Sequence, residues 1–140
     1  MAASKIVLDL KVGKIPVTCA RDAEGQLFGE MQQGDPVFGK IHDRATVVTR
    51  DTRDEMVGLR ARGIDSLGED PATGSAAGCT ASWMVRYGLQ KSAETLHIEQ
   101  GVEMQRPSHM YARAEKHGDK ITNVRVGGHA VEVAQGEYAL

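Results

Sequence analysis

Hydrophobic and polar residues alternate near the start of the chain with the two-residue period of a β-strand. The hydrophobic positions of the first such segment are Ile6, Leu8, Leu10 and Val12. The alternation returns in residues 14–20 and again in residues 27–33, with a connection around Gly25 that has the chemistry of a turn. This pattern predicts a meander of antiparallel strands.

The segment "GDPVFGKIHD" (residues 34–43) interrupts the alternation with two glycines and a proline, which indicates a loop or a hinge. Alternating segments then resume, and we expect strands within residues 45–51, 56–64, 95–101, 109–118, 120–134 and 136–140. The charged run at residues 50–55 is typical of a solvated hairpin tip. Residues 117–119 and the pair Gly127–Gly128 suggest hairpin or bulge sites.

One helix stands out, beginning near Thr73 and ending about Gly88, where a glycine suits the position after the last helical turn. Nearly all residues in its first two turns are small, and it has no Lys or Glu before Arg86. Such a helix suits close approach of backbone from several sides, so we expect a sheet to enclose it. The fold class is therefore α+β, with a curved antiparallel sheet or roll wrapped around one central helix.

Composition narrows the function. The 140 residues suit a single domain spanning residues 1–140, and their 41% hydrophobic content is that of a globular protein. A net charge of −2 and only 4% aromatic residues argue against a nucleic-acid partner. We find no apolar run of membrane-spanning length and no signal-peptide pattern. Two cysteines do not make a disulfide framework, so a cytoplasmic location is expected.

The start of the helix carries the candidate chemistry. The first N–H groups of a helix have no partner within it and carry the positive end of its dipole, so they bind carboxylate or phosphate readily. Thr73 or Ser75 can cap this end, and Gly74 lets a ligand approach the backbone. Glu69 and Asp70 stand just before it, and burial would make such a carboxylate a proton carrier. The alternative is a plain capping turn, in which Asp70 bonds to local N–H groups.

The eleven residues "GEDPATGSAAG" (residues 68–78) resemble the signature of the PhzF-like family of phenazine biosynthesis, a relative of the diaminopimelate epimerase fold. The strands on both sides are also similar to that family, including the glycine pair and the closing "GEYAL". The resemblance implies two lobes, each a curved sheet around a helix, with the substrate between them. Residues 5–40 resemble the end of the first lobe and residues 45–140 resemble the second.

This resemblance implies isomerisation or epimerisation by proton transfer at carbon, without metal or cofactor. It implies that Asp70 is a pocket residue, at about the position of a catalytic cysteine in the epimerases. Gly74 and Ser75 would hold the substrate carboxylate, whereas Cys79 would be a small core residue. The family's N-terminal catalytic glutamate and Gly-His motif have no counterpart in these 140 residues. The chain's histidines match no such motif and are expected on strands or at the surface; they are His42, His97, His109, His117 and His129.

Three functions remain open at this point. The chain can be an isomerase acting on a small carboxylate-bearing metabolite, with two copies supplying two helix starts and two Asp70 carboxylates to one symmetric cleft. It can instead be a non-catalytic module that binds small anions, or a shortened protein with a structural or vestigial role. A half-lobe with an exposed sheet edge needs a partner, so we expect a homo-oligomer, with residues 34–43 as the place for strand exchange.

Overall fold

The computed structural model describes residues 3–11, 13–38, 45–52 and 54–137. In these ranges one helix, α1 (Gly74–Arg86), is accompanied by nine strands. The strands are β1 (Ser4–Leu10), β2 (Gly13–Arg21), β3 (Leu27–Gln32), β4 (Ala45–Thr49), β5 (Leu59–Asp65), β6 (Gly68–Asp70), β7 (Leu96–Gln100), β8 (Ser108–His117) and β9 (Lys120–Ala130). No helix among the described residues is long and apolar enough to cross a membrane.

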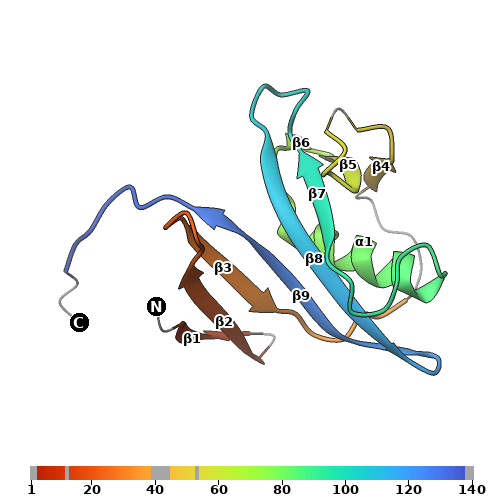
Figure 1. The fold of residues 1–140 in the computed structure, drawn as a ribbon, viewed down its shortest axis with the longest axis horizontal. Helices are drawn as coiled ribbons and strands as arrows, with labels where there is room; N and C mark the ends of the chain where they lie inside the picture. Colours follow the sequence, from red (N-terminus) through yellow and green to blue (C-terminus); the bar gives the residue numbers. More distant parts are fainter. Residues whose placement is uncertain (1–2, 12, 39–44, 53, 138–140) are drawn as a thin grey trace.

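The strands form one sheet in the order β1-β2-β3-β9-β8-β7-β5-β4, and the short β6 pairs with β5 (Figure 1). All pairings are antiparallel except that of β5 with β7, which is parallel. Parallel neighbours need a crossover connection, and α1 lies in the segment between β5 and β7. The α+β class with a curved sheet and one helix is therefore confirmed, with one parallel pair that the sequence did not predict.

Most of the predicted elements are present. The meander of β1, β2 and β3 is confirmed, and Gly25 in the β2–β3 turn has the positive φ of 80° that its position suggested. β4 and β5 form the antiparallel pair on either side of the charged run. The predicted turn at residues 117–119 joins β8 to β9. Residues 34–38 have no regular structure, and the remainder of the predicted hinge, with His42, lies outside the described residues.

Two predictions at the C-terminal end are wrong. β9 ends at Ala130, opposite the first residue of β3, and residues 131–137 have no strand beside them and no regular structure. The last three residues of the predicted strand 136–140 lie outside the described residues. The pair Gly127–Gly128 forms no turn either, because it lies inside β9, where a Cβ on Gly127 would come within 2.7 Å of the Phe28 ring. The register shifts instead between Arg113 and Glu115 of β8, where two residues of β9, Asn123 and Val124, lie opposite the single residue Ala114.

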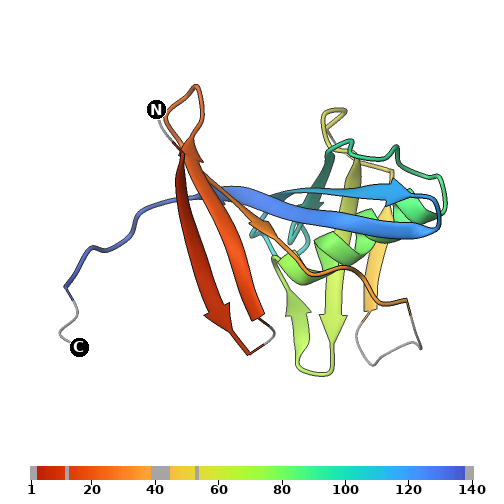
Figure 2. The ribbon, with the colours of Figure 1, turned by 90° about the horizontal axis from the view of Figure 1, so that it is seen from below.

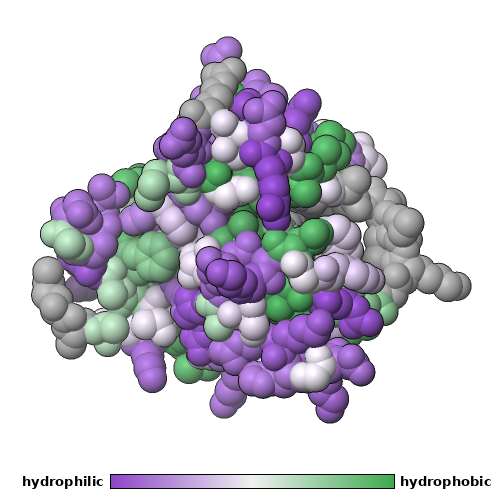
Figure 3. Space-filling view, turned by 45° about the vertical axis from the view of Figure 1, so that its right-hand side comes forward, coloured by the Kyte–Doolittle hydropathy of each residue, from purple (hydrophilic) through white to green (hydrophobic). Residues whose placement is uncertain are grey.

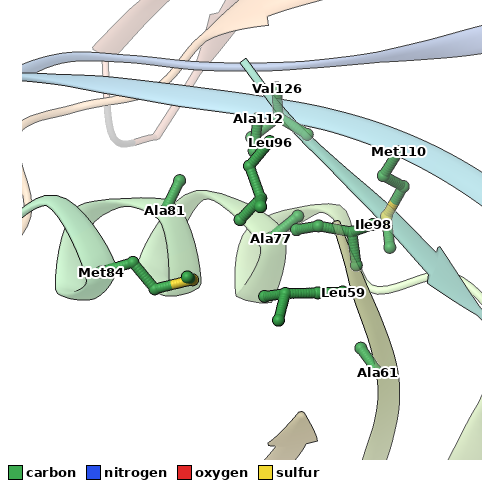
Figure 4. Close-up of a cluster of buried hydrophobic side chains, with 10 residues drawn as sticks. All are labelled: Leu59, Ala61, Ala77, Ala81, Met84, Leu96, Ile98, Met110, Ala112 and Val126. Carbon is green, nitrogen blue, oxygen red and sulfur yellow. The ribbon is translucent and has the colours of Figure 1, made fainter. Parts of the chain in front are cut away.

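The core lies between α1 and the face of the sheet that it covers (Figure 4). Its members are Leu59, Ala61, Ala77, Ala81, Met84, Leu96, Ile98, Met110, Ala112 and Val126. Four of the ten are alanine, so the helix and the strands approach closely with little side chain between them. A second cluster joins Val85 of the helix to Ala114, Ile121 and Val124. Removal of this apolar surface from water stabilises the helix against the sheet.

β1 and β2 extend the sheet beyond the helix. Both ribbon views place the β1–β2 hairpin away from α1 (Figures 1 and 2). Every residue of β1 is exposed, and Ile6, Val7 and Leu10 keep 50%, 58% and 50% of their surface accessible. Hydrophobic side chains also interrupt the hydrophilic surface on the face shown in Figure 3. Within the described ranges, therefore, no element covers these apolar side chains of the first strand.

Candidate functional site

A cleft of about 500 Å³ lies between α1 and the strands β4 and β5. It is lined by Thr46, Val48, Gly63, Ile64, Asp65, Asp70, Thr73, Ser75, Ala76, Cys79, Thr80 and Trp83. Three of the four residues predicted for the site, Asp70, Thr73 and Ser75, are among them. The fourth, Gly74, is the first residue of the helix and lies between two of the lining residues. The structure thus brings the helix start and a carboxylate to one cleft.

The turn before the helix is held by the Asp70 carboxylate. One of its oxygens accepts the Ala72 N–H at 3.2 Å, and the other accepts the Thr73 hydroxyl at 2.8 Å. These are the local bonds expected of a capping turn. Thr73 occupies the N-cap position, yet its hydroxyl makes no capping bond to the helix; it donates to Asp70 and accepts from the Gln100 amide. The first N–H groups of α1 therefore remain without a side-chain cap.

A buried glutamine fixes this turn to the sheet. Gln100 is 1% exposed, and its amide nitrogen donates to the Asp70 carbonyl at 2.6 Å and to the Thr73 hydroxyl at 2.9 Å. Its amide oxygen accepts the Thr73 N–H at 3.3 Å. This residue was not predicted from the sequence. The sequence signal that could have found it is the alternation along β7. Leu96, Ile98 and Gln100 occupy the inward positions of this strand, and Gln100 is the polar residue of the three.

Gly63 of β5 leaves room for this network. A Cβ at this position would lie 2.5 Å from the Thr73 hydroxyl oxygen and 2.9 Å from the Gln100 amide nitrogen. The first meander also contributes, because the Gln33 side chain donates to the Gly74 carbonyl at 3.3 Å. Residues far apart in the sequence therefore position the start of the helix.

The two acidic residues before the helix have different surroundings. Glu69 does not line the cleft; both of its oxygens accept bonds from the Arg62 guanidinium, at 2.9 and 2.7 Å. This hydrogen-bonded guanidinium holds the pKa of Glu69 below its usual value, and the carboxylate in turn raises the pKa of Arg62. Because side chains alternate along a strand, Asp70 reaches the cleft whereas Glu69 does not.

One expectation about burial at the site is wrong. The sequence left the burial of Asp70 open, and its side chain is exposed in the single chain. Cys79 is exposed and lines the cleft, whereas a core position was expected. The reason is that the sheet covers one side of α1, and the side carrying Ser75, Cys79 and Trp83 stays open. The small residues of that open side border the cleft and are not enclosed by strands.

Asp65 is a second carboxylate at the cleft, and it was not predicted from the sequence. It lies two residues beyond Gly63 on β5, and Gly63 is paired with Asp70. Positions related in this way lie on one face of a sheet, with about 7–8 Å between them. One Asp65 oxygen accepts the Leu67 N–H at 2.8 Å, which holds the β5–β6 turn. The alternation along β5 was the signal that could have placed Asp65 beside the helix.

The histidines of the strands lie away from the cleft. The ring of His97 stacks on that of Tyr111 with centroids 4.6 Å apart, and its Nε2 lies 3.0 Å from Nδ1 of His109. His129 contacts Asp22 at 3.1 Å, and His117 contacts Glu115 at 3.2 Å. None of these four rings, which are the histidines of the described part of the chain, lines the cleft. They are strand and surface histidines, as expected.

Comparison with known proteins defines the class to which this fold and site belong. A family model described as phenazine biosynthesis-like protein (PhzC-PhzF) matches residues 63–136, which include β6, the turn, α1 and the last three strands. This match covers more than half of the chain. The chain therefore belongs to the phenazine biosynthesis-like protein family.

Relatives that match about half of the chain are named as isomerases. The chain is 46% identical over 72 residues to a trans-2,3-dihydro-3-hydroxyanthranilate isomerase of Pseudomonas chlororaphis, an alignment that covers 51% of the chain and 26% of the relative. It is 44% identical over 70 residues to an uncharacterized isomerase of Mesorhizobium japonicum, covering 49% of the chain and 23% of the relative. The matched segment is thus about a quarter of each relative's length.

Solved structures support the fold over the whole chain. A phenazine biosynthesis protein of the PhzF family from Bacillus anthracis matches with a TM-score of 0.79 at 17% identity, covering 100% of this chain and 70% of its own. A "Predicted Epimerase" from Pseudomonas aeruginosa matches with a TM-score of 0.75 at 23% identity, covering 99% of this chain and 67% of its own. At these identities the likeness concerns the fold alone.

Proposed function

We propose that the cleft binds a small carboxylate-bearing metabolite and that the protein isomerises it by proton transfer. One observation supports this proposal most directly: the start of α1, which has no side-chain cap, and the Asp70 carboxylate lie in the same cleft. A cleft of about 500 Å³ suits a small metabolite. The Pseudomonas relatives are named for the isomerisation of an anthranilate, which is a carboxylic acid, and this name supports the substrate class.

In this proposal the carboxylate of the substrate lies at the first turn of α1. The uncapped N–H groups and the positive end of the helix dipole attract an anion there. Ser75, which is exposed and lines the cleft, offers a hydroxyl donor in the same turn. The partly buried network of Gln100 and Thr73 holds the turn in place before the ligand arrives, so little of the binding energy is lost to ordering the site.

Proton transfer at carbon needs one group that removes a proton and a second that returns one. We assign these roles to Asp70 and Asp65, the two carboxylates that line the cleft among the residues that the structure describes. Residues related as these two are in the strand pair stand about 7–8 Å apart, which leaves room for a substrate carbon between their side chains. Covering of the cleft by a ligand would exclude water from around both carboxylates.

The test uses deuterium incorporation into a substrate. Wild-type protein in D₂O is incubated with trans-2,3-dihydro-3-hydroxyanthranilate, and proton NMR follows the loss of the carbon-bound hydrogen and the formation of an isomer. We expect exchange with the wild type and a loss of at least about 100-fold in Asp70→Asn, the usual scale for removal of a general acid or base. Asp119→Asn, in the β8–β9 turn, is the matched control and keeps the wild-type rate. Exchange that persists in Asp70→Asn contradicts the assignment.

A second candidate function is anion binding without catalysis. It is favoured by the exposure of Asp70 and by the two local hydrogen bonds that its carboxylate accepts, since both suit a residue that only shapes the turn. A thermal-shift screen of small carboxylic acids separates the two functions. Stabilisation by an acid that exchanges no carbon-bound hydrogen, in the wild type and in Asp70→Asn alike, supports binding alone.

A further inference from the structure

The outer face of the sheet, on the side away from α1, carries two histidines on neighbouring strands. His97 lies in β7 between Leu96 and Ile98, whose side chains point toward the helix (Figure 4), so the alternation turns His97 outward. His109 lies in β8, one position before the core residue Met110, and faces outward for the same reason. Nε2 of His97 is 3.0 Å from Nδ1 of His109. Two ring nitrogens, each able to bind a metal ion, therefore face one another across the strand pair.

The ring of His97 is fixed in one orientation by its surroundings. Its Nδ1 lies 3.0 Å from the Met56 carbonyl oxygen, and its plane stacks on Tyr111 with the ring centroids 4.6 Å apart. A carbonyl oxygen only accepts hydrogen bonds, so Nδ1 of His97 carries the hydrogen and Nε2 of the neutral ring presents a lone pair. A backbone carbonyl in this place is a usual orienting partner of a metal-binding histidine. His97 is thus arranged as a ligand through Nε2.

The two rings have the spacing of two ligands of one ion. Without a metal, the Nδ1–H of His109 donates to the lone pair of His97. Two nitrogens that each bind zinc at about 2.0–2.1 Å lie roughly 3 Å apart, close to the 3.0 Å between these atoms. His109 is exposed, so its ring can turn, with its hydrogen on Nε2, until both lone pairs converge. A metal ion can therefore replace the shared hydrogen with little movement of the strands.

Glu99 offers a carboxylate beside this pair. It stands directly opposite His109 and two residues after His97 on the same face of β7. Cβ atoms directly across two strands lie about 4.5–5.5 Å apart, so one ion can reach both side chains. The Glu99 carboxylate makes no hydrogen bond or ion pair with another described residue and is free to turn. Arg60, its neighbour on β5, is paired with Glu103 at 3.0 Å, which offsets the positive charge near the site.

We propose that His97 and His109 bind a zinc ion, with Glu99 as the third ligand and water completing the coordination. Imidazole nitrogens and a carboxylate suit zinc and its transition-metal neighbours, whereas magnesium and calcium take oxygen ligands. In the described part of the chain no group of three His, Cys, Asp or Glu side chains is already gathered for a metal. The imidazole pair therefore takes the ion first, and Glu99 joins it by rotation about its side-chain bonds.

This site is separate from the cleft and from the proposed catalysis. The cleft lies between α1 and the strands β4 and β5, whereas His97 and His109 project from the opposite face of the sheet. The ion would connect β7 to β8 and, through His97, to the segment before β5 that contains Met56. Binding to the folded chain alone stabilises it, so zinc should raise the midpoint of urea denaturation. Failure of the deuterium experiment leaves this inference untouched, and the reverse is also true.

The test measures zinc binding to the full chain by calorimetry, after a chelator has removed any bound metal. We expect one saturable site in the wild type, at least about 100-fold weaker binding in His109→Asn and about 10-fold weaker binding in Glu99→Gln. His97→Asn keeps a side-chain donor for the Met56 carbonyl but removes Nε2, so its loss of binding reports on the ligand. His117→Asn, an exposed histidine of the same strand as His109, is the matched control and keeps the wild-type affinity.

NMR of the ring nitrogens locates the ion. Zinc should shift the imidazole signals of His97 and His109 and leave the amides of Gly74 and Ser75 unchanged. Absence of saturable binding to a folded wild-type chain overturns the inference, and so does equal weakening in His109→Asn and the control. Shifts confined to the cleft overturn it as well. If His97→Asn does not fold, as judged by circular dichroism, His109→Asn decides alone, because His109 is exposed and belongs to no core cluster.

Discussion

Replacement of Gln100 by leucine removes the hydrogen bonds that connect the core of the sheet to the turn before α1. Leucine has nearly the volume of glutamine, so the variant leaves no large cavity and isolates the polar contribution. Three bonds are lost: two that the amide donates, at 2.6 Å to the Asp70 carbonyl and 2.9 Å to the Thr73 hydroxyl, and one that it accepts from the Thr73 N–H at 3.3 Å.

A net contribution of about 1 kcal/mol for each bond gives an expected loss of about 2–3 kcal/mol in the free energy of unfolding. The estimate applies to this site because Gln100 is 1% exposed, so water does not replace the lost partner inside the core. Urea denaturation followed by circular dichroism measures the change. Gln135→Leu, which replaces an exposed glutamine outside the sheet, is the control and changes the free energy by less than about 0.5 kcal/mol.

The same variant also tests the link to function. Without Gln100 the turn loses its bonds to the core of the sheet and keeps those of the Asp70 carboxylate. Amide hydrogen exchange at Ala72 and Thr73 therefore becomes faster, and carboxylate binding becomes weaker. A Gln100→Leu protein as stable as the control, with unchanged exchange at these two amides, would refute the reasoning that the buried amide positions the site.

Two further predictions concern the same region. Gly101→Ala lowers the free energy of unfolding, measured with urea, by about 2–4 kcal/mol, because Gly101 has a φ of 82° and the Cβ of an alanine there would lie 2.8 Å from the Pro71 carbonyl oxygen. The control Gly136→Ala, which has open space around it, leaves the free energy unchanged. Equal effects of the two substitutions would contradict the prediction. Arg62 lowers the pKa of Glu69, so their ion pair stabilises the native state at pH values above the usual pKa of a glutamate. This stabilisation is lost as the pH falls through the lowered pKa of Glu69. The difference in urea midpoint between wild type and Glu69→Gln should therefore be present at pH 6 and vanish in strong acid, whereas a constant difference would contradict the assignment.

The sequence predicted the longer elements well because their signals are local. Strands β1, β2, β7 and β8 follow the two-residue alternation, and the helix is bounded by the turn at Thr73 and by Gly88. What it missed depends on neighbours that are distant in the chain. β6 has three residues and exists because β5 offers an edge, and β9 ends at Ala130 because its partner β3 begins opposite that residue.

The part of the candidate site that was predicted is local in the sequence, and the part that was missed depends on residues distant in the chain. The helix start and Asp70 form one continuous stretch, so their proximity follows from the sequence. Asp65 and Gln100 join them only through strand pairing and the crossover by α1. The composition of the helix did not reveal which of its sides the sheet leaves open, and that is why Cys79 was expected in the core.

Whether the start of α1 binds a carboxylate is decided by a titration observed by amide NMR. Labelled wild-type protein is titrated with trans-2,3-dihydro-3-hydroxyanthranilate, and the amide signals are followed by residue. We expect saturable shifts concentrated at Gly74, Ser75 and Ala76, with none at the β1–β2 hairpin. Saturable shifts that map to another part of the chain, or none at all, would contradict a carboxylate site at this helix start.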